Sequence, residues 1–167
     1  MEVTLEAIRE LRDRTGAGIM DCKRALVDAE GDLDRAQAIL HEKGIASVEK
    51  RASRATSEGL VESYVHSGGR IGAIVQVDCE TDFVARTSVF KDLAHDVAMQ
   101  VAAMTPLYLD IADIPDGEDH EPAEACLLQQ PFIRDPAKTV QDLVTEAAAK
   151  LGENVRVRRF ARFSLGE

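Results

Sequence analysis

The sequence of 167 residues contains no tryptophan, only 4% aromatic residues, and no apolar run close to the roughly 18 residues that a membrane span requires. The first residues, MEVTLEAIRELRDRTG, begin an amphipathic pattern at once, which predicts no signal or transit segment. The cysteines, Cys22, Cys79 and Cys126, are odd in number and widely spaced, which favours reduced thiols over a disulfide framework. We therefore expect a soluble cytoplasmic protein with no membrane partner.

Positive charge is also in short supply, since 20 Lys and Arg residues stand against 30 Asp and Glu residues and the net charge is −10. Affinity for DNA or RNA depends mainly on cations that neutralise phosphates, so the balance argues against a general nucleic-acid binder. The arginines of residues 156–162 lie beside Phe160 and Phe163, a combination also found in strands that bind single-stranded nucleic acid. They fit equally well the solvated face of a sheet or the acids of a protein partner. We expect no direct nucleic-acid partner.

The motifs of ordinary enzyme chemistry are missing. The sequence has no G-x-x-x-x-G-K-[ST] loop, no G-x-G-x-x-G after a strand and no G-x-S-x-G. Residues 110–124 carry seven acids and His120, but their spacing matches no calcium-binding loop, and Pro115 and Pro122 favour an exposed connection. The sequence predicts a protein that is not an enzyme and has no cofactor and no metal of its own.

The N-terminal quarter of the chain predicts three short helices. Thr4 is a suitable N-cap for the first helix, and Gly16, Gly31 and Gly44 follow the three apolar stripes as stop signals. Residues 45–58 predict a short helix that fades into a linker. Because a unit of this size is only marginally stable alone, it serves either to hold a partner or as a simple structural bundle.

Beyond the linker the apolar period changes to two, which is typical of strands. Residues 59–66 and 70–79 predict two strands joined by a turn at Ser67-Gly68-Gly69, and residues 154–163 predict a third. One helix is predicted for residues 88–104, with an apolar stripe of Phe90, Leu93, Val97, Val101 and Met104. Another is predicted to begin with Asp135 as cap and Pro136 at the first helical position, and to end at Gly152. The predicted fold class is α+β: a three-helix module followed by a three-stranded antiparallel sheet packed with helices.

The segment Thr81-Asp82-Phe83-Val84 joins the second strand to the first helix of this sheet domain. Thr81 can cap a short helical turn, and Asp82 is favoured in its first turn by the positive helix end. Phe83 either folds into the local core or projects from a rigid turn, as the aromatic anchors of interfaces do. The residues alone leave both alternatives open.

Four segments, LRDRTGAGIMDCKRAL, ETDFVART, QPFIRDPAKTV and GENVRVRRF, follow one another along the chain and together resemble elongation factor Ts. The resemblance implies a guanine nucleotide exchange factor of translation elongation. Such a factor binds elongation factor Tu in its GDP-bound and nucleotide-free states, displaces Mg²⁺ and promotes GDP release. It also implies a ubiquitin-associated-like module at residues 1–50, a linker at 51–58 and a dimerisation-type core at 59–167.

The same resemblance assigns roles to residues of this chain. Residues Thr81, Asp82, Phe83 and Val84 match the family segment associated with dislodging Mg²⁺ from the partner. Residues Arg12, Ile19 and Met20 match module positions that touch the partner's nucleotide-binding domain. Residues Tyr64, His66 and Gly68 match a core segment that meets another domain of the partner.

The chain departs from the family between the first core helix and the QPF segment. Many members carry a long helical hairpin there, whereas residues 105–130 are short, acidic and interrupted by prolines. Some members also have two related core halves, and this chain has strands for one sheet only, so we expect that a homodimer supplies the second half. The alternative function is a non-catalytic adaptor that uses the three-helix module to hold a protein partner.

Overall fold

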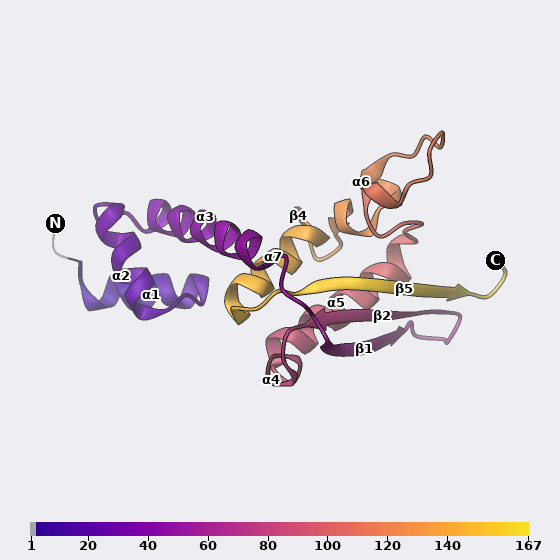
Figure 1. Ribbon diagram of the computed structural model, residues 1–167, viewed down its shortest axis with the longest axis horizontal. Coiled ribbons are helices and arrows are strands. Elements are labelled where there is room, and N and C mark those ends of the chain that lie inside the picture. The colour runs from indigo at the N-terminus through magenta and orange to yellow at the C-terminus, as the bar shows by residue number, and fades with distance from the viewer. Residues whose placement is uncertain (1–2) are drawn as a thin grey trace. The chain divides into compact units, whose positions relative to one another are not determined.

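The computed structural model describes residues 3–167 (Figure 1). The chain divides into two compact units, one up to Arg51 and one from Ala52 onwards. Within the described part of the chain, no helix is both long enough and apolar enough to cross a membrane.

The first unit consists of three helices, α1 (Leu5–Thr15), α2 (Ile19–Asp28) and α3 (Leu33–Arg51). The Thr4 side chain accepts a hydrogen bond from the backbone of α1 at 3.2 Å, and Gly16 ends the helix in the left-handed conformation at φ 69°, as predicted. The buried core of the unit is small and aliphatic. It contains Ile8, Leu11, Cys22, Ala25, Leu26, Ala29 and Ala36.

The third helix is longer than the sequence predicts. Gly44 was expected to end it, but α3 continues without a break to Arg51. A glycine inside a helix costs only about 1 kcal/mol relative to alanine, and the residues that follow Gly44 include several good helix formers. Arg51 donates from Nε to the Ser47 carbonyl at 2.9 Å, which satisfies a backbone acceptor in the last turn.

The second unit contains the predicted three-stranded antiparallel sheet, which confirms the α+β class. Its strands are β1 (Glu58–Val65), β2 (Ile71–Cys79) and β5 (Arg156–Ser164), in the order β1-β2-β5. The β1–β2 turn uses Gly68 at φ 93° and Gly69 at φ 68°, a conformation that residues with a Cβ rarely adopt. The hairpin signal in the sequence was therefore correct.

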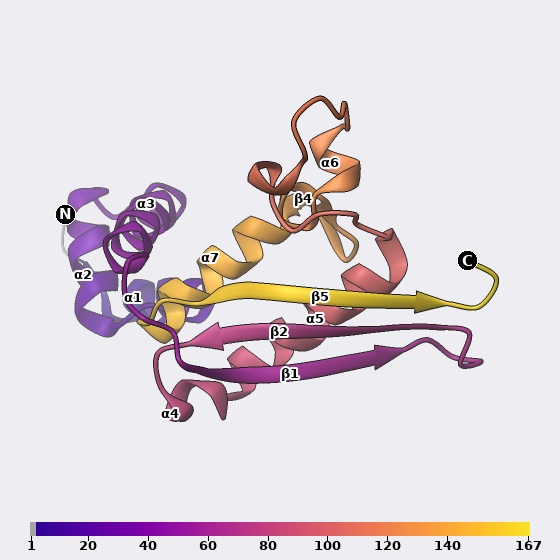
Figure 2. The same ribbon diagram turned by 45° about the vertical axis from the view of Figure 1, so that its right-hand side comes forward.

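Helix α5 (Ser88–Met104) covers one face of this sheet and contacts all three strands (Figure 2). The predicted stripe is buried at Phe90 and Val97, whereas Met104 is 44% exposed, so its place in the core was wrong. Met104 is the last residue of the helix, and Thr105 turns the chain away in a left-handed conformation at φ 50°. Helix α7 (Val140–Leu151) packs beside α5.

The segment between α5 and α7 is folded rather than irregular. It contains η1 (Ile111–Asp113), α6 (Pro122–Ala125) and η2 (Leu127–Gln129). A two-stranded sheet of β3 (Pro131–Phe132) and β4 (Asp135–Thr139) follows, which the sequence did not predict.

The start of the last helix was predicted four residues too early. Asp135 and Pro136 belong to β4, and the helix begins at Val140. Thr139 is its N-cap, and Thr139 and Asp142 form a reciprocal capping box with hydrogen bonds of 2.8 and 3.1 Å. This box satisfies two backbone donors, whereas a cap at Asp135 would leave the β3 backbone unpaired.

Two fully buried glutamines fasten the segment after α5 to that helix. Gln100 donates from Nε2 to the Gln130 side chain at 3.2 Å and to the Pro131 carbonyl at 3.1 Å. Gln130 in turn donates to the Glu124 carbonyl at 2.7 Å, and the Ile133 amide donates to Gln100 at 3.0 Å. The hydrogen bonds of the two side-chain amides replace those that they would make to water if exposed. Because each amide needs its particular partners, the network fixes how the segment packs against α5.

Candidate functional site

The chain makes a tight corner where β2 runs into α4 (Asp82–Ala85), and each turn of the corner is capped by a threonine. The Thr81 hydroxyl accepts from the Val84 amide at 3.4 Å and so caps α4, as the sequence predicts. Thr87 caps α5 and donates from its hydroxyl to the Val84 carbonyl at 2.7 Å. The corner is thus closed by its own short-range hydrogen bonds on both sides.

Phe83 projects from this corner. Its exposed fraction is 78%, the highest among the large apolar side chains of the described residues, whereas Ala85 of the same helix is buried. Of the two alternatives left open by the sequence, the exposed one is therefore found. An apolar ring in water forgoes about 2 kcal/mol of burial free energy, which makes such a ring a candidate contact for a partner.

Asp82 lies beside Phe83 and forms an ion pair with Arg86 at 2.8 Å, one helical turn further on. Both side chains are largely exposed, at 47% and 75%. Pairs of this kind contribute at most about 1 kcal/mol to folding because solvent screens them. Asp82 can therefore exchange Arg86 for another cation at little cost.

The corner is also held by Glu153, a residue that the sequence analysis did not single out. Its carboxylate accepts hydrogen bonds from the Glu80 amide at 3.0 Å, the Thr81 amide at 3.0 Å and the Thr81 hydroxyl at 2.6 Å. The Glu80 carboxylate accepts in return from the Asn154 amide at 2.7 Å. Gly152, which ends α7, indicates a turn at this point of the sequence. Nothing in the sequence shows that this turn lies next to Thr81, which is 72 positions before Glu153.

Cys79 closes the inner side of the corner. Its buried thiol donates to the Thr81 carbonyl at 3.1 Å. Burial, followed by the negative charge of Glu153, raises the pKa of Cys79 to about 11. The thiol is therefore protonated at ordinary pH and serves as a hydrogen-bond donor rather than as a nucleophile.

In the first unit, the predicted contact residues Ile19 and Met20 are exposed at the start of α2, by 55% and 63%. Arg12 on α1 is exposed as well. Val27 is 57% exposed and lies seven residues after Met20, hence on the same side of the helix. The sequence analysis missed Val27, although its position outside the buried stripe of α2 could have indicated it.

The hairpin residues lie far from the corner. The Tyr64 hydroxyl and His66 Nδ1 are 3.1 Å apart, and the Tyr64 ring meets the edge of His95 on α5 at a centroid distance of 5.8 Å. Gly68 is in the turn at the start of β2, whereas the corner follows its end (Figure 2). A strand of nine residues spans roughly 26 Å, so the structure does not bring the hairpin and the corner together.

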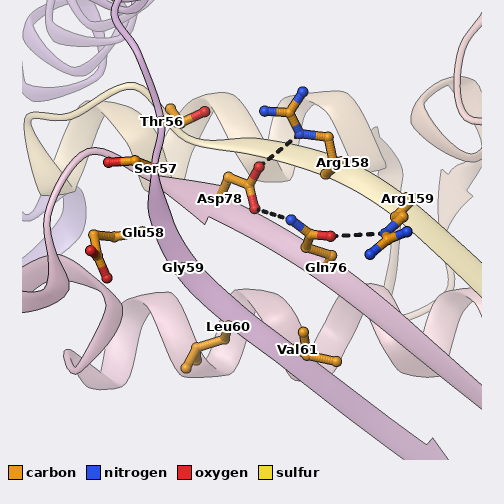
Figure 3. Close-up of a pocket in the computed structure, with 10 residues that line it drawn as sticks. All are labelled: Thr56, Ser57, Glu58, Gly59, Leu60, Val61, Gln76, Asp78, Arg158 and Arg159. Atoms are coloured by element: carbon orange, nitrogen blue, oxygen red, sulfur yellow. Dashed lines mark hydrogen bonds and ion pairs between the residues drawn. The ribbon is translucent and has the colours of Figure 1, made fainter.

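A shallow polar pocket lies on the face of the sheet opposite α5 (Figure 3). Arg158 pairs with the buried Asp78 at 2.8 Å, Gln76 donates to Asp78 at 2.8 Å, and Arg159 donates to Gln76 at 2.9 Å. Through this network, Arg158 and Arg159 link β5 to the neighbouring strand β2. Its lining residues are Thr56, Ser57, Glu58, Gly59, Leu60, Val61, Gln76, Asp78, Arg158 and Arg159.

The acidic segment forms a local cluster around Glu118. Tyr108 donates its hydroxyl to Glu118 at 2.7 Å, and His120 Nε2 lies 2.9 Å from the same carboxylate oxygen. The hydrogen bonds from Tyr108 and then from His120 lower the pKa of Glu118. Across residues 3–167, no three His, Cys, Asp or Glu side chains gather in a way that could hold a metal ion.

Known proteins of one family match this chain along nearly its whole length. Residues 32–121 and 119–167 match the family described as Elongation factor TS. Elongation factor Ts of Carboxydothermus hydrogenoformans is 47% identical over 99% of this chain and 90% of its own length. That of Caldanaerobacter subterraneus subsp. tengcongensis is 46% identical over 99% and 98%, and that of Coprothermobacter proteolyticus 43% identical over 100% of both chains.

The matches define a translation elongation factor, and the fold is consistent with them. The chain belongs to the elongation factor Ts family. The alignment with the Carboxydothermus protein runs over 195 positions, more than the 167 residues of this chain, so the relative carries residues that are missing here. The chain thus corresponds to a short form with a single core domain.

The exposure of Phe83 leads to a prediction about stability. Phe83→Ala is expected to change the free energy of unfolding by no more than about 0.5 kcal/mol, because the ring buries little surface. Phe90→Ala is the matched control, since Phe90 is fully buried and its truncation is expected to cost about 3–5 kcal/mol. Urea unfolding followed by circular dichroism measures both, and a large loss in the Phe83 variant would show that the ring packs against its own protein.

The raised pKa of Cys79 predicts a pH dependence. The protonated thiol contributes its full stability below about pH 9, the value of an unperturbed thiol, and loses that contribution as pH rises towards about 11. The stability difference between the wild type and Cys79→Ala should therefore shrink across this window in unfolding experiments. At pH 8 only about a thousandth of the thiol is ionised, so Cys79 should resist alkylation in the folded protein. Alkylation at the rate of an unfolded chain would contradict the assignment.

Proposed function

We propose that this chain is the guanine nucleotide exchange factor of elongation factor Tu in translation elongation. It binds elongation factor Tu–GDP, displaces Mg²⁺ and promotes GDP release so that GTP can bind. The observation that carries the proposal is the exposed ring of Phe83 on a corner held by hydrogen bonds, in a chain of the elongation factor Ts family. Thr81, Asp82 and Val84 form the backbone and polar surroundings of that ring.

The mechanism is a coupling between two binding equilibria. GDP and its Mg²⁺ favour one arrangement of the GTPase's phosphate site, and the factor favours the nucleotide-free arrangement. By linkage, the factor weakens GDP binding by the same ratio by which GDP weakens binding of the factor. No bond is made or broken by this chain, so its action requires contact alone and no cofactor of its own.

The ring supplies the differential contact that such a coupling requires. When Phe83 inserts into the partner, it buries apolar surface only in the arrangement that has room for the ring. That arrangement misplaces the ligands of Mg²⁺, the largest local positive charge at the phosphates. With the ion displaced, the negative charge of the phosphates is less well compensated and GDP dissociates faster.

Two further surfaces fit contacts with the same partner. Arg12, Ile19 and Met20 are exposed on the three-helix unit, where they are proposed to meet the nucleotide-binding domain. Tyr64, His66 and Gly68, on the β1–β2 hairpin, are proposed to meet another domain. In this proposal, residues 1–50 form the partner-binding module, residues 51–58 the linker and residues 59–167 the dimerisation-type core.

The exchange activity is tested with Phe83→Ala. Loss of an interface anchor of this kind costs about 2 kcal/mol or more, so the variant should accelerate GDP release about 30-fold less than the wild type. Stopped-flow release of fluorescent GDP from elongation factor Tu measures the rate. Leu107→Ala removes an apolar side chain that is 59% exposed elsewhere, and it should leave the rate unchanged.

The same experiment separates exchange from the adaptor alternative. An adaptor needs only the three-helix unit and would bind without any change in GDP release. Unaltered release on addition of the wild-type protein would therefore exclude the exchange function and favour the adaptor.

We also propose that a second copy of the chain covers the sheet face opposite α5. Val61, Val65, Ile74 and Phe163 are exposed on that face by 71%, 66%, 46% and 68%, next to the polar network of Asp78. Apolar side chains gathered on one face of a sheet favour burial against another surface, and an identical copy provides a self-complementary one.

The dimer is tested with Ile74→Glu, which places a charge at the centre of this face. Light scattering should give the mass of a dimer for the wild type and of a monomer for the variant, because an unpaired buried charge destabilises an interface by several kcal/mol, on the order of 3–5. Met104→Glu is the matched control, since Met104 is equally exposed, at 44%, but lies at the end of α5. A wild type that is a monomer at working concentrations would rule out the dimer.

A further inference from the structure

Phe83 lies on a helix that is too short to be stable by itself. Helix α4 has only four residues, and of these only Ala85 is buried. Isolated helices shorter than about 12 residues are not stable in water, so contacts outside α4 must fix the direction of the ring. The hydrogen bonds of Thr87 and Cys79 that close the corner join residues only two or three positions apart in the sequence.

Glu153 supplies a contact that comes from elsewhere in the fold. Its two carboxylate oxygens accept three hydrogen bonds of 2.6–3.0 Å from the backbone and side chain of Thr81 and from the backbone of Glu80. Hydrogen bonds to an ionised acceptor are about twice as strong as those between neutral groups. The partners lie 72 and 73 residues earlier in the sequence, so the carboxylate ties the corner to the α7–β5 turn.

The turn that carries Glu153 is itself fixed. Gly152 ends α7 with its amide donating to the Ala148 carbonyl at 3.0 Å. Asn154 is buried and donates from its side chain to the carbonyls of Ala52 and Arg54, at 3.2 and 2.8 Å. The backbone amide of Asn154 donates to the Glu80 carboxylate, and the backbone amide of Glu80 donates to the Glu153 carboxylate. The turn and the corner are therefore joined by hydrogen bonds in both directions. Figure 2 shows this turn at the end of the sheet where β2 leads into α4.

Glu153 also sets the orientation of the helix cap. The Thr81 hydroxyl donates its proton to Glu153 and thereby keeps a lone pair for the Val84 amide, the bond that caps α4. The hydrogen bonds thus run from Glu153 to Thr81 and from Thr81 to Val84. Phe83 lies between Thr81 and Val84 in the sequence. An amide in place of the carboxylate has one acceptor oxygen instead of two and no charge, so it cannot satisfy all three donors equally well.

We propose that Glu153 is a positioning residue of the exchange site, which holds the Thr81–Val84 corner rigid so that Phe83 projects before the partner binds. The inference rests on the proposed function, because its effect on exchange requires that Phe83 acts on the GTPase. A preformed corner saves the cost of ordering these residues when the ring inserts, which is the step that displaces Mg²⁺ and accelerates GDP release.

The test compares Glu153→Gln with the wild type in fluorescent-GDP release at increasing concentrations of the factor. The variant should lower the saturating release rate about tenfold and leave the half-saturating concentration unchanged. A merely structural defect reduces the folded fraction, which raises the half-saturating concentration and leaves the saturating rate intact. Glu146→Gln is the matched control: Glu146 lies on α7, pairs with Lys138 and should behave as the wild type.

Hydrogen exchange of the unbound protein provides a readout that does not depend on the partner. In Glu153→Gln the amides of Glu80 and Thr81 should exchange about tenfold faster, while those of α5 should keep their protection. Unchanged exchange at these two amides would overturn the proposal. An equal loss of protection in α5 would also overturn it, because Glu153 would then stabilise the whole unit rather than the corner.

A second variant covers the case in which Glu153→Gln does not fold. Thr81→Val keeps the shape of the side chain and removes the hydroxyl that links Glu153 to Val84, so it should lower the saturating release rate about fivefold. A wild type that fails to accelerate GDP release overturns the proposed function itself. A wild type that accelerates release, with both variants matching it, overturns only the role of Glu153.

Discussion

A carboxylate that accepts three hydrogen bonds from one corner of the backbone is the constraint on which the candidate site depends. Without Glu153, the amides of Glu80 and Thr81 and the hydroxyl of Thr81 would lose their shared acceptor. With it, all three donors are paired, and Phe83 on the same corner is 78% exposed. Phe83 is thus a large apolar side chain in contact with water, although folding generally favours burial of such groups. Departures of this kind from the rules of folding are common at functional positions.

The sheet relates this corner to the rest of the second unit. Strand β2 is central, paired on both sides, and its side chains Val75, Val77 and Cys79 are fully buried against the helices. A central strand of this kind is among the last parts of a domain to open, so it forms a stable base for the corner at its end. Gly59 lets β1 approach closely at the same end, because a Cβ there would lie 2.1 Å from the Val77 carbonyl oxygen.

Local signals predicted most of the elements. Threonine caps, glycine stops and periodic apolar residues correctly gave α1, α5 and the β1–β2 hairpin, since each depends on residues close together in the sequence. Predictions were wrong where two local signals competed. Gly44 was taken as a stop although its neighbours favour a helix, and Asp135 with Pro136 imitated a helix start that Thr139 and Asp142 provide.

In the candidate site, too, the features set by neighbouring residues could be predicted, and those set by residues distant in the sequence could not. The sequence identified Thr81 to Val84 and predicted the cap by Thr81, but left the exposure of Phe83 open. The long-range hydrogen bonds of the corner come from Glu153 and Asn154, which reach it only after the chain has passed through α5 and α7. Such contacts are set by tertiary packing and have no signature at the positions themselves.

The buried pair of Gln100 and Gln130 has a consequence for the behaviour of the protein in acid. Carboxamides do not titrate, so the joint between α5 and the following segment keeps its hydrogen bonds at any pH at which the core is folded. Mild acidification should thus leave this segment attached to α5.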